Sequence, residues 1–220
     1  MGKGAIFDAD GTLIDSMPIW EDAGARFLAG LGIKAEEGLG DILFRMSLDE
    51  GAAYLKRAYK LGMTEEEVKK GVLGVINDFY VNRVQPKAGV REFLKELSSR
   101  NIPMYVATSS TREHIRAAFE RLGLYEYFDG MITCEEAGAG KQEPTIFLLA
   151  AQRMGLAPKD VFVFEDVIHA VRTAGRAGFV TVGVYDEASA SDNEAMRAES
   201  SIYLHSLENW EKFRVAAGLD

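Results

Sequence analysis

Near its amino terminus the chain reads Phe7-Asp8-Ala9-Asp10-Gly11-Thr12-Leu13. The apolar run Ala5–Phe7 predicts a buried strand, so Asp8 stands at the point where that strand ends. In open α/β sheets, ligands bind outside the carboxyl ends of the strands. Two acids spaced two residues apart can point to the same side of an extended chain, which makes Asp8 and Asp10 candidates for one site. The same residues also fit an Asp-Gly hairpin turn between two apolar runs.

Four further apolar runs predict strands of the same kind: Met104–Ala107, Met131–Thr133, Val161–Phe164 and Val180–Val184. Near-continuous apolar runs are typical of a parallel sheet that is covered on both faces. Helical patterns alternate with these strands, at Gly89–Ser99, Pro144–Met154 and Ala170–Ala177. A fourth helix is expected to begin at Ser110, which has capping-box spacing to Glu113, and to end at Gly123. This alternation predicts an α/β fold, a Rossmann-like parallel sheet with helices on both faces.

The segment from about Met17 to Gln85 differs from the rest, because it has helical periodicity and no convincing strand. Thr64-Glu65-Glu66-Glu67 has the spacing of a capping box that opens one of its helices. A helical block between the first strand and the rest of an α/β domain indicates an insertion. We therefore expect residues 1–16 and 86–220 to form the core and residues 17–85 to form a helical cap. Within the core, the polar stretch Asp186–Ser201 is expected to be a surface loop with a short helix.

Composition excludes several classes of protein. The chain has 220 residues, 47% of them hydrophobic and 27% charged, which is ordinary for a globular protein. Its 34 acids against 25 bases give a net charge of −9, so a general nucleic-acid binder is not expected, because phosphate contacts need a basic surface. The single cysteine, Cys134, predicts a reducing, cytoplasmic location and a small buried side chain. We expect no signal peptide, because the apolar part of the amino terminus is too short and is followed too soon by an acid at Asp8. We expect no membrane partner, because no apolar run approaches the roughly 18–20 residues that cross a bilayer.

Polar side chains also follow two other predicted strands. Thr108 and Ser109 stand between a strand and a helix, where a hydroxyl and helix amides can bind an anion or simply cap the helix. Glu165 and Asp166 follow the strand at 161–164 and stand before the next helix, where they also suit a cap.

Lys141 follows Gly138-Ala139-Gly140, but the spacing is wrong for a phosphate-binding P-loop and Gln142 stands where Ser or Thr should follow. A lone lysine is most often solvated. The acid pairs, the hydroxyl and this lysine nevertheless fall at successive strand ends of one predicted sheet. We interpret that convergence as a single site.

In this order, Asp8-x-Asp10-Gly11-Thr12, then Thr108, Lys141 and Glu165-Asp166 resemble the haloacid dehalogenase-like hydrolase superfamily. More narrowly, the chain is similar to its phosphatases and β-phosphoglucomutases with a helical cap inserted after the first motif. The resemblance covers nearly the whole chain and is specific for the superfamily, but only weakly specific for substrate. The loop after the lysine departs from the family's Pro-x-Pro-Asp, since Gln142-Glu143-Pro144-Thr145 follows Lys141 here.

The residues allow a definite chemistry. A carboxylate that attacks a phosphate dianion meets repulsion of roughly 4 kcal/mol per charge pair at about 4 Å, so a cation must offset about 8 kcal/mol. Mg²⁺ suits oxygen ligands, and the expected ligands are the side chains of Asp8 and Asp166 with the carbonyl of Asp10. The resemblance implies that Glu165 lies near the metal. Lys141 would add a second positive charge.

Asp8 would then form an aspartyl phosphate, while Asp10 protonates the leaving alcohol and later activates water. The Thr108 hydroxyl and the neighbouring groups of Ser109 would hold the transferring oxygens. These roles predict a magnesium-dependent phosphatase that acts on a small phosphorylated metabolite, a phosphosugar being the preferred class.

Substrate choice is expected to come from the cap. In the stretch Phe44–Ser47, Arg45 is a candidate for a second anionic group or sugar hydroxyls, or is a solvated arginine at a helix end. Trp20 is a candidate pocket residue or part of the cap core, and it stands where the resembling mutases carry a histidine. The alternatives are a β-phosphoglucomutase-like phosphotransferase, a phosphoacceptor module resembling response-regulator receivers, and a non-catalytic binding module. We expect a monomer, because an inserted cap has to move over the site.

Overall fold

The structure is a computed structural model that describes residues 2–43 and 46–219. The chain divides into two compact units. Met1–Asp15 and Gln85–Asp220 form the first, called the core unit below, and Ser16–Val84 form the second, called the helical unit. Each unit has its own buried apolar residues.

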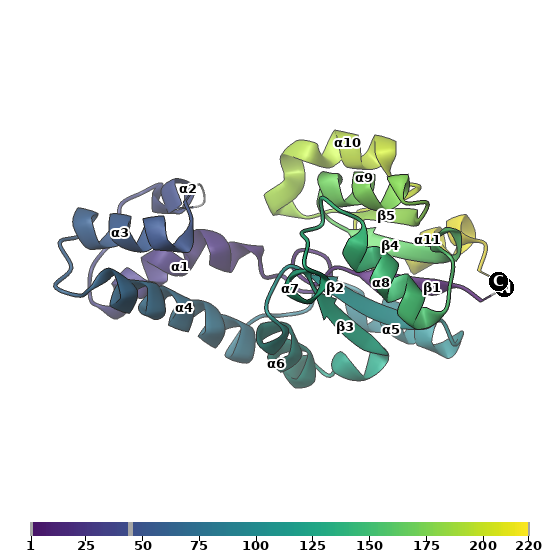
Figure 1. Ribbon diagram of the computed structural model, residues 1–220, viewed down its shortest axis with the longest axis horizontal. Coiled ribbons are helices and arrows are strands. Elements are labelled where there is room, and N and C mark those ends of the chain that lie inside the picture. Colours follow the sequence, from purple (N-terminus) through teal and green to yellow (C-terminus); the bar gives the residue numbers. More distant parts are fainter. Residues whose placement is uncertain (1, 44–45, 220) are drawn as a thin grey trace. The chain divides into compact units, whose positions relative to one another are not determined.

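The core unit is built on one parallel sheet with the strand order β3-β2-β1-β4-β5-β6 (Figure 1). The strands are β1 (Gly4–Phe7), β2 (Met104–Thr108), β3 (Gly130–Thr133), β4 (Val161–Glu165), β5 (Val180–Val184) and β6 (Ile202–Leu204). In the register of the sheet, Phe7 lies opposite Val106 of β2 and Phe164 of β4. The carboxyl ends of these strands therefore meet at one edge. The predicted α/β fold with a parallel sheet is confirmed, while β6 was not predicted.

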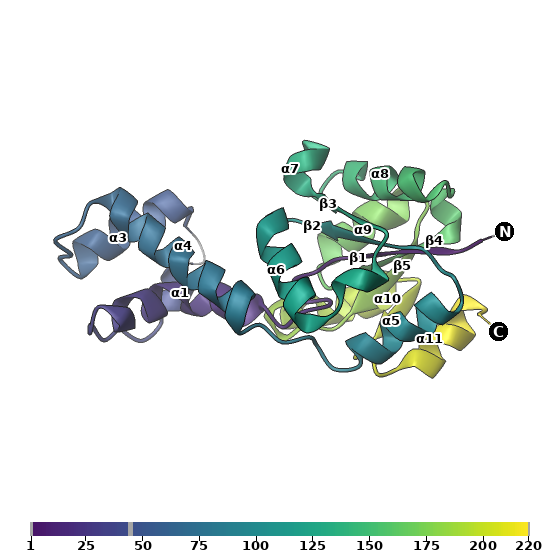
Figure 2. The same ribbon diagram turned by 90° about the horizontal axis from the view of Figure 1, so that it is seen from below.

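Helices cover both faces of this sheet, and Figure 2 shows α8 on one side of the strands with α5 and α11 on the other. On the first face, α8 (Thr145–Met154) and α9 (Ile168–Arg176) bury Phe147 and Ala170 in one apolar cluster with Ile6 of β1. On the second face, α5 (Val90–Ser99), α6 (Arg112–Leu122) and α11 (Trp210–Ala217) contribute aromatic rings. The ring of Phe213 lies 5.2 Å from that of Phe164. Burying such a ring contributes about 1.5–3 kcal/mol, so both faces hold the sheet edge in place.

Shorter elements complete the core unit. They are α7 (Cys134–Ala137), α10 (Asn193–Glu199) and three 3₁₀ turns at Tyr125–Tyr127, Pro158–Asp160 and Glu187–Asp192. The helices expected from the sequence begin and end within two residues of those found at α5, α8 and α9.

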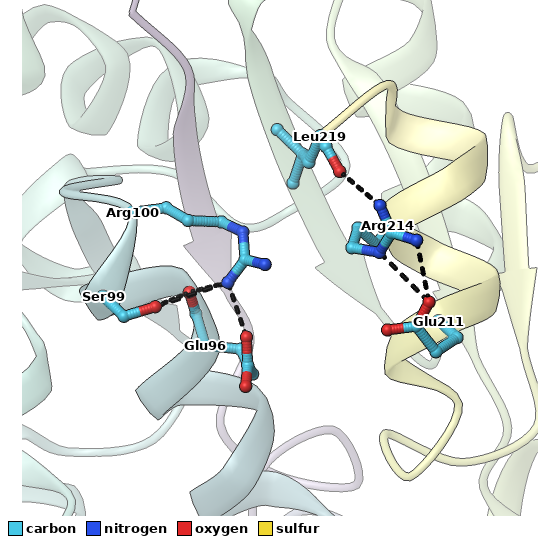
Figure 3. A network of polar contacts seen from close by, with 6 residues as sticks. All are labelled: Glu96, Ser99, Arg100, Glu211, Arg214 and Leu219. Atoms are coloured by element: carbon cyan, nitrogen blue, oxygen red, sulfur yellow. Dashed lines mark hydrogen bonds and ion pairs between the residues drawn. The ribbon is translucent and has the colours of Figure 1, made fainter.

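Arginine side chains donate hydrogen bonds near the carboxyl ends of α5 and α11, as Figure 3 shows. Arg100 donates to the backbone carbonyl of Glu96 at 3.0 Å and to its carboxylate, and its guanidinium stacks over the ring of Trp210 at 4.9 Å. Arg214 donates to the carbonyl of Leu219 at 3.2 Å. Cations at helix carboxyl ends interact favourably with the unpaired carbonyls there. The Arg100–Trp210 contact also joins α5 to α11 below the sheet.

The described residues of the helical unit form α1 (Met17–Gly30), α2 (Leu39–Leu43), α3 (Leu48–Ala58) and α4 (Glu65–Asn82). The predicted capping box at the start of α4 is present, since Glu67 N donates to Thr64 Oγ1 at 3.2 Å and Thr64 N donates to the Glu67 carboxylate at 2.7 Å. Ser47 and Glu50 make the same arrangement at the start of α3. That this unit serves as a cap stays a prediction.

One predicted cap is wrong. The residue that caps α6 is Thr111, whose hydroxyl accepts a hydrogen bond from His114 N at 3.4 Å. Ser110 donates instead to the Oδ2 atom of Asp10 at 2.7 Å. A hydrogen bond to a carboxylate is stronger than one to a neutral backbone group, which explains why the serine points away from the helix.

Candidate active site

The sheet edge brings three acids and one lysine together. Asp8 follows β1, Glu165 ends β4, Asp166 is the next residue, and Lys141 lies in the loop between α7 and α8. The Lys141 ammonium pairs with Asp8 Oδ1 and lies 2.8 Å from Glu165 Oε1. Each of the four residues exposes 6% of its surface or less. Lys141 is therefore not a solvated surface lysine, and it reaches Asp8 despite the altered loop that follows it.

The three acids are arranged so that they can share a cation. One ligand atom from each of Asp8, Glu165 and Asp166 lies within 4.8 Å of the others. Among the described residues, the buried atoms Glu165 Oε2 and Asp166 Oδ2 have no hydrogen-bond partner. Burying an unpaired carboxylate is costly unless a cation or a proton compensates it. Oxygen donors of this type suit hard divalent ions, so the residues present fit a metal ion.

Burial dominates the electrostatics of this cluster. It raises the pKa of Glu165 and Asp166 well above their usual range, and the neighbouring carboxylates add to the shift. It also raises the pKa of Asp8, against the opposing charge of Lys141. Burial alone would lower the pKa of Lys141, but the charges of Asp8 and Glu165 outweigh it and raise that pKa. Three carboxylates face one ammonium group, so the metal-free site has an excess of negative charge.

The turn after Asp8 fits closely against Asp166. Gly11 has φ +79°, and a Cβ atom there would lie 2.5 Å from Asp166 Oδ2. The next residue, Thr12, donates its hydroxyl to Asp166 Oδ1 at 3.0 Å. Because β1 pairs in parallel with β2 and β4, the alternative of a hairpin turn at this position is wrong. Only glycine fits the turn without displacing the carboxylate.

A second group of polar side chains lies at the end of β2. Half-buried Asp10 accepts the hydrogen bond from Ser110, and Ser110 N donates to the hydroxyl of buried Thr108 at 3.0 Å. That bond uses the Thr108 oxygen as an acceptor, which leaves the hydroxyl proton to donate. His114 also interacts with Asp10, although burial lowers the pKa of this histidine. The sequence did not predict the contact between Ser110 and Asp10, and it did not mark His114.

The structure does not bring every predicted residue into this cluster. Ser109 is exposed, and its hydroxyl lies 3.4 Å from the sulfur of half-buried Cys134. Trp20 belongs to the helical unit, where its indole donates to the Tyr80 hydroxyl at 3.3 Å. Arg45 lies outside the described residues. The roles of these three candidates in substrate binding stay predictions.

Two residues beside the cluster were missed by sequence reasoning. Lys87 donates to the Gly11 carbonyl at 2.5 Å, to the Tyr185 carbonyl at 2.7 Å and to the Asp186 carboxylate at 2.6 Å. Asp186 is buried, with 7% exposure. The stretch that it begins is mostly exposed and holds the short helix α10, as expected, but Asp186 itself is buried, and the ion pair with Lys87 compensates that burial. No local pattern marks either residue.

Comparisons with known proteins agree with this fold. The family model described as haloacid dehalogenase-like hydrolase matches residues 3–178, and the chain belongs to this family of hydrolases. It is 30% identical over 203 residues to a phosphorylated carbohydrates phosphatase of Thermotoga maritima, covering 92% of this chain and 93% of that protein. Hexitol phosphatase A of Escherichia coli is 30% identical over 210 residues, covering 94% and 92%.

A solved structure from Thermotoga maritima, provisionally named as a β-phosphoglucomutase, matches with a TM-score of 0.83 and 28% identity, covering 99% of this chain and all of that one. Within the described part of the chain, no helix has both the length and the apolar composition needed to span a bilayer.

Proposed function

We propose that this hydrolase is a phosphatase that cleaves phosphoric monoesters of small phosphorylated sugars, with Asp8 as nucleophile and Mg²⁺ as cofactor. The observation that carries the proposal is the buried cluster of three acids and Lys141, with two carboxylate oxygens left unpaired. The names of the two phosphatase relatives support the substrate class.

The proposed reaction uses these side chains in two steps. An Asp8 carboxylate oxygen forms a bond to phosphorus as the bond from phosphorus to the sugar oxygen breaks. Asp10, two residues further along the same turn, gives its proton to the departing oxygen, which leaves as the alcohol. Water then attacks phosphorus, Asp10 takes a proton from it, and the bond from Asp8 to phosphorus breaks to release phosphate.

Other residues stabilise the charge that moves during this exchange. The Lys141 ammonium, held against Asp8, offsets the repulsion between that carboxylate and the incoming phosphate. The Thr108 hydroxyl and the amides that follow β2 can donate to the transferring oxygens. Asp8, Asp166 and the Asp10 carbonyl would hold Mg²⁺, with Glu165 beside it, and the bound ion would supply further positive charge for the phosphate oxygens.

A related phosphotransferase is the second candidate, because the solved structure with the high TM-score carries a β-phosphoglucomutase name. The two functions differ in what accepts the phosphoryl group, which is water in a phosphatase and a second sugar hydroxyl in a mutase. We favour water, since Trp20 occupies the position where the resembling mutases have a histidine.

A panel of phosphate esters tests the proposal. We expect purified protein to release phosphate from sugar and hexitol phosphates in Mg²⁺, to release less from nucleotides and phosphoglycolate, and to be inactive in excess chelator. Activity that survives chelation would contradict the metal assignment. Conversion of β-glucose 1-phosphate to glucose 6-phosphate with a bisphosphate primer and without free phosphate would show a mutase.

Stability should depend on pH and metal together. The pKa values of Glu165 and Asp166 are raised by folding, so their contribution to the stability of metal-free protein is present below pH 4 and is lost as pH rises through the raised values. Mg²⁺ binds the ionised form. We therefore expect the stabilisation by Mg²⁺ to grow from pH 5 to pH 8, reaching about 2.7 kcal/mol at a hundredfold excess over Kd.

Urea unfolding at several pH values, in Mg²⁺ and in chelator, measures this stabilisation. Asp166→Asn protein serves as the control, because it lacks one ligand and should gain much less from the ion. A gain from Mg²⁺ that is the same at pH 5 and pH 8 would contradict the prediction.

The cap role of the helical unit, the substrate contacts of Ser109, Arg45 and Trp20, the monomeric state and the cytoplasmic location stay predictions. Gel filtration with light scattering tests the monomer. Substrate-dependent changes in KM on Trp20→Ala test the cap contact.

A further inference from the structure

Lys87 makes an unusually complete set of contacts for a lysine outside the reacting cluster. Its ammonium has three donors, and it meets three acceptors at 2.5–2.7 Å: the carbonyls of Gly11 and Tyr185 and the carboxylate of Asp186. Its side chain is 19% exposed. A flexible side chain held by this many bonds has lost its rotamer freedom, so its ammonium is a fixed point beside the site.

The three acceptors belong to two separate parts of the core unit. Gly11 lies in the turn after β1, whereas Tyr185 and Asp186 follow β5. The second oxygen of Asp186 accepts a hydrogen bond from Ala188 N at 3.0 Å, so this carboxylate is itself held in place. Lys87 therefore ties the turn after β1 to the segment after β5.

The contact to Gly11 has the most direct consequence. Its carbonyl belongs to the peptide that continues into Thr12, and the Thr12 hydroxyl donates to Asp166 at 3.0 Å. Gly11 has φ +79°, and a Cβ atom there would lie 2.5 Å from Asp166 Oδ2, so this peptide has little room. If the ammonium were removed, the carbonyl would lose a partly buried charge-assisted bond and the peptide could rotate.

We propose that Lys87 is a positioning residue for the metal: by fixing the Gly11–Thr12 peptide, it holds Asp10 and Asp166 in the arrangement that binds the divalent ion. This inference rests on the proposed function of the site. Lys87 touches none of the reacting atoms, and it acts through the turn.

Direct metal binding tests this role without any substrate. Titration of Mn²⁺, followed by electron paramagnetic resonance, should show a Kd about 10- to 100-fold higher in Lys87→Met than in wild type, the usual effect of losing a residue that orients metal ligands. At saturating metal, the KM for the ester should stay within about threefold of wild type, because the contacts that bind the substrate remain. Lys87→Arg keeps the charge but displaces the donors, so we expect a smaller loss of affinity.

Two controls separate positioning from general structure and from charge. Lys3→Met removes another lysine of the core unit, which pairs with Asp160 at 3.5 Å, and it should bind Mn²⁺ as wild type does. The double variant Lys87→Met/Asp186→Asn removes both charges of the pair. It should remain as weak as Lys87→Met, because the Gly11 carbonyl still lacks its donor.

The outcomes discriminate clearly. Wild-type Mn²⁺ affinity in both Lys87→Met and Lys87→Arg would overturn the proposal, and so would restored affinity in the double variant. If Lys87→Met does not fold, the Mn²⁺ affinity of Lys87→Arg alone decides: a weaker affinity than wild type supports the proposal, and wild-type affinity overturns it. Wild-type protein that binds no metal and hydrolyses no ester would instead overturn the proposed function.

Discussion

Asp8→Asn protein is expected to lose turnover by at least about 10⁴-fold, the scale at which removal of a nucleophile acts in other enzymes. The substitution keeps the shape of the side chain but replaces the attacking carboxylate oxygen with a neutral amide, which forms no acyl phosphate. Phosphate release from the best ester of the panel, together with acid-stable labelling by radioactive substrate, measures both the turnover and the intermediate. Neither should be detectable above background.

Two further variants serve as a control and as a test of the second chemical step. Asp160→Asn removes a carboxylate at the amino end of β4, the opposite end of the strand from Glu165, and it should leave activity unchanged. Asp10→Asn keeps the nucleophile. With an aryl phosphate, whose leaving group needs no proton, this variant should accumulate labelled Asp8 because water is no longer activated. Undiminished activity in Asp8→Asn would remove Asp8 from the mechanism.

Lys141→Met is expected to lower kcat by about 10³-fold, comparable to the loss of a strong electrostatic contact in a water-excluded site. Lys141 is the cation paired with both Asp8 and Glu165. Without it, the pKa of Asp8 should rise further, so the acidic limb of the pH–rate profile should move to higher pH. Steady-state rates from pH 5 to pH 9 in saturating Mg²⁺ measure this shift.

The same substitution should destabilise the fold, and by more at high pH. Removing one partner of a buried ion pair costs about 3–5 kcal/mol when the other partner stays charged. At low pH the carboxylates can take up protons instead, so the loss in metal-free protein should be smaller at pH 5 than at pH 8. Urea unfolding at both pH values compares this variant with Lys3→Met, whose partner lies outside the site. Equal losses at the two pH values would contradict the account.

Much of the core unit could be predicted because its strands are continuous apolar runs. The runs expected at 5–7 and 161–164 differ from β1 and β4 by one residue each, and the one at 180–184 matches β5. A strand buried on both faces needs apolar side chains at every position, and that pattern is visible locally. Strand β6 has only three residues, Ile202–Leu204, and lies at the edge. It pairs with β5, and three residues are too few for an apolar pattern to be detected.

In the candidate site too, the residues that could be predicted are those that a local sequence pattern marks. Asp8, Glu165 and Asp166 could be found because each stands at the end of a strand, where topology alone brings side chains together. Lys87 and Asp186 could not, since they lie 99 residues apart in sequence and meet only in the folded chain. Ser110 was misread because its spacing to Glu113 fits a cap, while the stronger acceptor, Asp10, lies 100 residues away.

The central place of β1 in the sheet has a consequence for how the protein is made. β1 leaves the ribosome before the two strands that it pairs with, since β2 begins at Met104 and β4 at Val161. The edge of β1 that pairs with β2 therefore stays unpaired until the helical unit has been synthesised, and the edge that pairs with β4 stays unpaired until about half of the core unit has followed. Long-range parallel pairing of this kind is slow, and the nascent chain would be most exposed to aggregation or to chaperones in that interval. The turn that carries Asp8 and Asp10 is therefore translated before the strands that flank β1, and it is assembled only after them.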